Sequence, residues 1–363
     1  MIARATVSTL RRLAAIAALA SMAASAQGAA PPVQSIEIYG SSVFDSAAVR
    51  AEFEPDILRY VELGWQAGFN GSVPENATEL EASMHLIDAK IRAALESRAP
   101  LAYLELGVTL DFGPPQQVHI TIDVVEKTDE ARRMPFRAAP TQELGDPGSL
   151  LALWEEYGQE MYQLALAGAP MRVDENNCPA LHCIAPFDLP ELAPYLPRFD
   201  DGARRYEEEL YAVAANSADA SERATALFVL AHTNDAQRLA PVLGRAIYDP
   251  NGGVRNNAMR VLIFLAQRRA DVDFPLHDLI AALDFPSSAD RNKAAYTVAA
   301  LAGQAKYRDT IRAEAVPAAL RLLRLEKPNN HDPAYEILMQ VSGETFGDRD
   351  YEAWERWAAT RAR

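Results

Sequence analysis

Three short stretches of the sequence share one pattern: ERATAL at positions 222–227, VRNNAM at 254–259 and DRNKAA at 290–295. Each has an arginine at its second position, an alanine three residues after that arginine and an aliphatic residue seven residues after it. The arginines lie 32 and then 36 residues apart, a period typical of stacked helical units. The sequence therefore predicts an all-α repeat region, an α-solenoid.

A second helix accompanies each motif helix, and polar turns separate the units. The second helices are predicted at 237–247, 276–283 and 316–325, and the turns at 249–253, 284–288 and 327–330. One helix pair cannot bury both of its apolar faces, whereas neighbouring pairs can. We expect the repeats to extend over 203–358, with an atypical C-terminal cap.

The string YDPNGGVRNNAM at 248–259 resembles the HEAT repeat. That resemblance implies an aspartate in the turn between units and an arginine at the start of the next helix, tied by hydrogen bonds. The implied pairs are Asp249 with Arg255 and Asp284 with Arg291. The implied structural residues are Arg223, Asp249, Arg255, Asp284 and Arg291.

Residues 33–128 predict a small α+β domain with the order β-α-α-β-β. A strand over 33–40 is followed by a helix for which Asp45 is the expected N-cap. A second helix lies at 80–96, and two strands follow. In the last strand four aliphatic residues alternate with His119, Thr121 and Asp123, which predicts a half-buried strand.

This domain resembles the POTRA module of outer-membrane assembly and secretion proteins. The resemblance rests on IEIYG at 36–40, Phe44 and a final strand ending in VVE at 124–126. It implies that an edge of the sheet binds a partner. The stretch over 54–80 is longer than in the family, and no barrel-forming segment follows. An unrelated α+β domain therefore remains the alternative.

The N-terminus predicts export. Three arginines precede or open a ten-residue apolar run at 13–22, and small residues follow at 24–26. Because the run is shorter than the roughly 20 residues that span a bilayer, we expect a signal peptide over 1–26, cleaved between Ala26 and Gln27. The alternative is an uncleaved anchor. The expected location is the periplasm or the exterior.

The net charge is strongly acidic. It is -15 for the whole chain and becomes -18 once the three arginines of 1–26 are removed. A charge of that sign argues against nucleic acid and anionic lipid as partners.

Residues 129–202 predict a linker, one helix at 148–167 and a proline-rich segment that holds Cys178 and Cys183. In an oxidising compartment these two cysteines are expected to form a disulfide. The alternatives are a metal site that adds His182, a redox pair and a cysteine–histidine nucleophile. A redox pair needs C-x-x-C spacing and zinc wants four ligands, so both fit this string poorly.

No phosphate-binding loop, dinucleotide fingerprint or hydrolase motif occurs, and the remaining histidines stand apart in sequence, where solvent-facing or capping roles are expected. We therefore predict no catalytic, cofactor or metal residues. The leading hypothesis is an exported, non-enzymatic protein that binds a protein or peptide through its repeats. The alternative is an enzyme or enzyme accessory, such as a HEAT-like lyase or a hydrolase.

Overall fold

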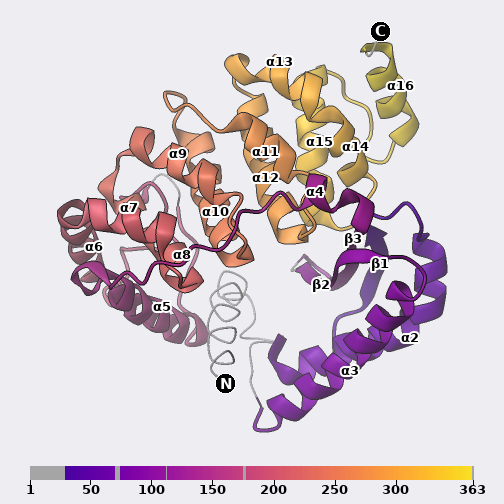
Figure 1. Cartoon of the computed structure of the whole chain (residues 1–363), viewed down its shortest axis with the longest axis horizontal. Helices are drawn as coiled ribbons and strands as arrows, with labels where there is room; N and C mark the ends of the chain where they lie inside the picture. Colours follow the sequence, from indigo (N-terminus) through magenta and orange to yellow (C-terminus); the bar gives the residue numbers. More distant parts are fainter. Residues whose placement is uncertain (1–28, 70–73, 112, 175–176, 362–363) are drawn as a thin grey trace.

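The computed structural model describes residues 29–69, 74–111, 113–174 and 177–361 (Figure 1). It confirms the predicted fold class: an α+β domain comes first, and a stack of helical repeats follows. The signal peptide over 1–26 and its cleavage site lie outside the described residues. None of the described helices is long and apolar enough to cross a membrane.

The N-terminal domain is a three-stranded sheet covered on one face by two helices. In chain order its elements are β1 (Val33–Tyr39), α2 (Ser46–Gly64), a π-helical turn (Trp65–Phe69), α3 (Ala77–Glu96), β2 (Leu101–Asp111) and β3 (Gln117–Glu126). The strand order is β1-β3-β2, and β3 runs parallel to β1 and antiparallel to β2. As predicted, the Asp45 carboxylate caps α2 by accepting from the Ala48 amide at 3.0 Å.

The prediction of a half-buried β3 is wrong, because both of its faces are buried. Ile120 and Ile122 pack into the domain's own core beneath α2 and α3. On the other face Thr121 and Asp123 are fully buried, since that face lies against the helical stack. Alternation correctly marked the two faces of the strand, but the polar face is an interdomain contact and does not meet solvent.

The stack has two layers of helices. The inner layer, as we call it, consists of α8 (Ala220–Leu230), α10 (Gly252–Arg268), α12 (Ser288–Ala302) and α15 (Pro328–Ser342), packed side by side. The outer layer consists of α9 (Ala236–Ala246), α11 (Leu276–Ala282), α13 (Ala305–Glu314) and α14 (Val316–Leu323). Ala226, Ala258 and Ala294 are fully buried, so small side chains lie where the inner helices pack. In Figure 1, α10 and α12 lie nearer the middle of the molecule than α9 and α13.

Both ends of the stack are covered by further helices. Before α8 come α5 (Leu150–Leu166), α6 (Tyr195–Arg205) and α7 (Glu207–Asn216). Since α6 begins at Tyr195, regular helix starts earlier than the boundary of 203 that we expected. At the other end α16 (Tyr351–Arg361) packs Trp354, which is fully buried, against Phe346 and Tyr335.

Candidate binding face on the inner helices

A ladder of buried arginines fixes the spacing of the inner helices. Each motif arginine donates from one guanidinium nitrogen to the carbonyls five and six residues before it, within its own turn. At least one other nitrogen of each guanidinium binds a carboxylate from a different part of the fold. Arg223 binds both oxygens of Asp249 at 2.8 Å, and Arg255 binds Asp290 at 2.8 Å.

Of the two pairs inferred from the sequence, Asp249 with Arg255 is joined by a hydrogen bond, but through the backbone carbonyl of Asp249, and Asp284 with Arg291 is wrong. Asp249 receives Arg223 and offers Arg255 only its backbone carbonyl, at 2.9 Å. Asp284 binds Arg132 and Arg321 instead of Arg291. The predicted aspartates do occupy the turns, but Arg223 and Arg255 each bind a carboxylate of the next unit, at Asp249 and Asp290.

The third rung of the ladder ends on the N-terminal domain. Arg291 donates to Asp123 of β3 at 2.6 Å, and both side chains are almost fully buried. Burial alone would lower the pKa of Arg291, but the Asp123 carboxylate beside it raises that pKa above its usual value. The Arg291 guanidinium also lies 4.0 Å from the centre of the Tyr39 ring, on β1. The sheet therefore supplies the carboxylate that a further repeat would otherwise contribute.

The segment over 127–149, which we call the strap, runs along the turns of the stack. Near its start, the Arg133 guanidinium donates to the carbonyl of Asp284 at 2.9 Å. Further on, the Arg137 amide donates to Tyr248, and Gln142 forms a bridge with Ser217. The strap thus passes the three turns in reverse order, as Figure 1 shows between α4 (Glu130–Arg133) and α5. The predicted linker is an ordered part of the fold.

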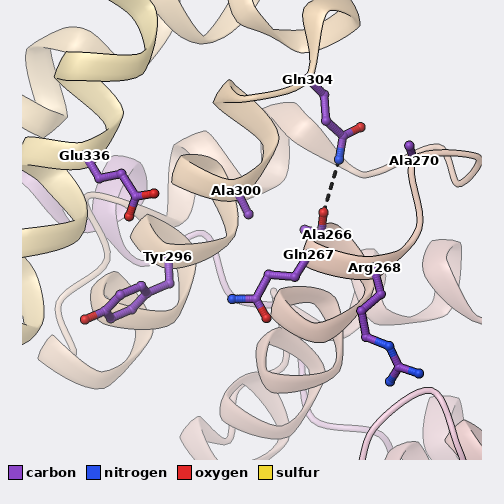
Figure 2. Close-up of a pocket in the computed structure, with 8 residues that line it drawn as sticks. All are labelled: Ala266, Gln267, Arg268, Ala270, Tyr296, Ala300, Gln304 and Glu336. Atoms are coloured by element: carbon purple, nitrogen blue, oxygen red, sulfur yellow. Dashed lines mark hydrogen bonds between the residues drawn. The ribbon is translucent and has the colours of Figure 1, made fainter. Parts of the chain in front are cut away.

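The strap and the sheet cover one end of the inner helices and leave a face of α10, α12 and α15 open. A depression of about 430 Å³ lies on this face (Figure 2). Tyr296 is 39% exposed there, which is unusual for an aromatic side chain on a packed helix. Eight residues line the depression: Ala266, Gln267, Arg268, Ala270, Tyr296, Ala300, Gln304 and Glu336.

Two basic side chains lie on the same face, within two helical turns of the depression. Arg260 projects from α10 and Lys293 from α12, three residues before Tyr296. Burial lowers the pKa of Arg260 below its usual value. Burial and then the charge of Arg260 lower the pKa of Lys293 to about 7. In the described part of the chain neither side chain has a carboxylate within ion-pair distance.

The opposite side of the face is acidic. Asp332 and Glu336 project from α15, beyond Tyr296. Burial raises the pKa of the Tyr296 hydroxyl, and these two carboxylates raise it further. The face therefore changes from basic on α10 to acidic on α15, with an exposed tyrosine between the two charges.

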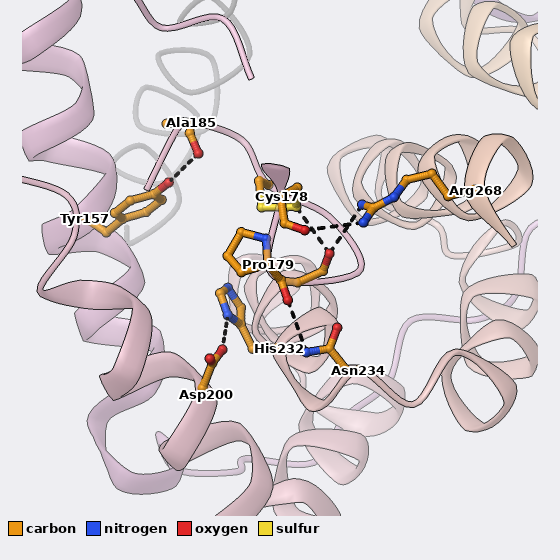
Figure 3. The surroundings of a disulfide bond; sticks show 10 residues. Tyr157, Cys178, Pro179, Ala185, Asp200, His232, Asn234 and Arg268 are labelled. Carbon is orange, nitrogen blue, oxygen red and sulfur yellow. Dashed lines mark hydrogen bonds and ion pairs between the residues drawn. A yellow bond between two sulfur atoms is a disulfide. The ribbon is translucent and has the colours of Figure 1, made fainter. Parts of the chain in front are cut away.

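The predicted disulfide between Cys178 and Cys183 is present and borders this face (Figure 3). Its loop is held on the inner layer, because Leu181 donates to the Ala231 carbonyl at 3.0 Å and Arg268 donates to carbonyls of the loop. His182, between the two cysteines, is buried. Its ring stacks on Phe228 of α8 at 5.0 Å, and burial lowers its pKa to about 3.

Removing the disulfide is expected to lower the free energy of unfolding by about 2 kcal/mol, because the bond closes only a short loop. The variant is Cys178→Ala with Cys183→Ala, and the measurement is urea unfolding with and without a reductant. Reductant should bring the wild type to the level of the variant and leave the variant unchanged. Two alkylatable thiols in the unreduced, folded protein would contradict the bond.

Of the other histidines, His85 is exposed as expected, and three are buried. His119, His232 and His331 are buried, and they bond to Ser35, Asp200 and the Leu323 carbonyl. His277 is exposed, as predicted. Among the residues that the structure describes, no group of three or more histidine, cysteine or acidic side chains is arranged to hold a metal ion.

These features define the class: an α+β domain joined to an α-helical-repeat protein. No protein-family profile matches the chain. No curated protein matches it either. Among solved structures it is similar to a designed armadillo repeat protein in complex with the peptide (KR)4, with 15% identity and a TM-score of 0.34. The match covers 47% of this chain and 83% of that one. At that TM-score the likeness carries no argument, so the architecture rests on the helices and contacts described above.

Proposed function

We propose that this chain is an exported, non-enzymatic interaction protein that binds a protein or peptide partner on the open face of α10, α12 and α15. The observation that carries the proposal is the depression around Tyr296. Exposed aromatic rings beside charged groups are typical of surfaces that bind proteins. A cavity of this size also holds one or two side chains of a peptide.

The stack is, in this proposal, of the HEAT type. The arginine ladder supports it, because aspartates and arginines at the unit boundaries tie adjacent turns together. A rigid stack presents its open face without reorganising, which lowers the entropic cost of binding an extended partner.

The N-terminal domain is proposed to be POTRA-like and to offer a second contact through β2. Its β-α-α-β-β order supports this. So does the position of β2, which lies at an edge of the sheet with its outer side paired to no described strand. A free edge can accept an extended segment of a partner through backbone hydrogen bonds.

Site-specific photocrosslinking tests the proposed face. A photoreactive amino acid replaces Tyr296 in one sample and Ala281, an exposed residue of the outer helix α11, in the other. We expect a discrete crosslinked partner from position 296 and none from 281, recovered from the cell envelope of the source organism. Equal crosslinking from both positions, or from neither, contradicts the proposal.

Export is tested on the same material. The mass of the protein recovered outside the cytoplasm should correspond to a chain that begins at Gln27. The enzymatic alternative would prevail if the purified mature chain converted a hydrolase or lyase substrate and a single polar substitution on the open face abolished turnover.

A further inference from the structure

Arg260 differs from the other large buried cations of the stack. Arg223, Arg255 and Arg291 each bind a carboxylate and two backbone carbonyls. The Nε of Arg260 is enclosed, and among the residues that the structure describes it has no hydrogen-bond partner and the guanidinium has no ion pair. Enclosing an N–H donor without an acceptor is unfavourable, so a buried donor of this kind normally has one.

Lys293 adds a second positive charge beside it from the adjacent helix. Its ammonium has one weak contact, 3.5 Å from the Ala289 carbonyl one turn back. Asp290 acts on it electrostatically, but Arg255 already binds that carboxylate at 2.8 Å. Lys327, the residue before α15, contributes further positive charge. Within the described residues, Arg260 and Lys293 therefore have no carboxylate of their own to balance their charge, although the net charge of the chain is -15.

Holding two like charges together costs free energy that a bound anion would recover. A guanidinium and an ammonium on neighbouring helices can each donate to one carboxylate, and charge-assisted bonds of this kind are the stronger ones. Because the surroundings are partly dehydrated, such a pair gains more than it would on an open surface.

We propose that Arg260 and Lys293 form a binding site for an acidic side chain, aspartate or glutamate, of the peptide segment that occupies the open face. This inference rests on the proposed function, since it names the chemistry that the partner presents. The depression around Tyr296 lies one turn further along α12 and would hold a neighbouring side chain of the same segment. A nucleic acid would bring a long row of phosphates to a chain of net charge -15, whereas one aspartate or glutamate side chain brings a single negative charge to the two cations.

The probe is a fluorescein-labelled eight-residue peptide of alternating glutamate and alanine, with an amidated C-terminus. Its binding to the mature chain is measured by fluorescence anisotropy at low salt. Replacing Arg260 and Lys293 with glutamine should weaken binding by about tenfold or more, because both charge-assisted bonds are lost. The matched control is Arg59→Gln with Arg245→Gln, which removes the same charge from exposed positions outside the inner layer and should leave the affinity within about twofold.

A second variant keeps the test decisive if the first one folds poorly. Lys293→Glu places a carboxylate beside Arg260, so it should raise the thermal midpoint and also abolish binding of the probe. The double glutamine variant should itself be at least as stable as the wild type, because it removes two uncompensated cations.

Several outcomes would overturn the site. The first is that the wild type and the double glutamine variant bind the probe peptide with equal affinity. Tighter binding of a phosphoserine version of the probe would assign the site to phosphate. Tighter binding of a glutamine version with a free C-terminus would assign it to a terminal carboxylate. A partner that still crosslinks at position 296 in the double variant, with undiminished yield, would leave the proposed function standing and remove only the acidic-side-chain site.

Discussion

Replacing Arg291 with methionine is expected to lower the free energy of unfolding by about 3–5 kcal/mol, measured by urea denaturation at neutral pH. The substitution leaves Asp123 buried and without its cationic partner at 2.6 Å. It also removes the donors to the carbonyls of Phe285 and Pro286 and the contact with the Tyr39 ring. Methionine keeps the length and most of the volume, so the loss reports charge and hydrogen bonds rather than a cavity.

The matched control is Arg269→Met. Arg269 also forms an ion pair, with Asp271 at 2.8 Å, but both side chains are largely exposed. Its loss should cost less than about 1 kcal/mol. Combining Arg291→Met with Asp123→Asn should cost less than the sum of the single changes, because the uncompensated charge is gone. If Arg291→Met cost no more than Arg269→Met, the ladder would not join the two domains energetically.

Replacing Trp154 with alanine is expected to lower the free energy of unfolding by about 3–5 kcal/mol. Trp154 is 3% exposed, and its ring centre lies 5.3 Å from those of Tyr157, Phe199 and Phe228. The cluster joins α5, α6 and α8, so the substitution opens a cavity where the first inner helix is covered.

Leu166→Ala is the control on the same helix, because Leu166 ends α5 and is 46% exposed. It should change the free energy of unfolding by about 0.5 kcal/mol or less. Near-ultraviolet circular dichroism of the Trp154 variant should lose intensity, since the remaining rings lose their fixed partner. Equal effects of the two substitutions would mean that α5 is not part of the cooperative stack.

Much of the fold could be predicted because the repeated motif marks where each inner helix begins. An arginine with an alanine three residues later marks the start of each inner helix, and the structure begins α8, α10 and α12 within three residues of these arginines. The disulfide was also predictable, since two cysteines close in sequence have few alternatives in an oxidising compartment.

The partners of the ladder could not be predicted from spacing. In sequence Asp249 lies six residues before Arg255, yet the carboxylate that binds Arg255 is Asp290, 35 residues away. Which carboxylate a guanidinium reaches depends on the stacking of the units, which a local motif does not encode. The polar face of β3 was predicted to meet solvent for a similar reason. A polar strand face that packs against another domain has the same alternating sequence pattern as one that faces water.

For the proposed binding face, the sequence indicated which helices form it but not which residues. The sequence pointed to the helices that start at the motif arginines, but nothing marked Arg260 or Tyr296, since an exposed tyrosine and an unpaired arginine look ordinary in a helical pattern. The signal that distinguishes Arg260 is the lack of a partner in three dimensions.

The junction of Asp123 with Arg291 also bears on the order in which the chain acquires its structure. The two residues are 168 positions apart, so a chain made from its N-terminus exposes the polar side of the sheet until most of the repeats have emerged. Contacts this distant in sequence slow the search for the native state. During that interval the bare sheet face is the part of the nascent molecule most open to mispairing, and a chaperone that shields it would be expected to raise the yield of folded protein.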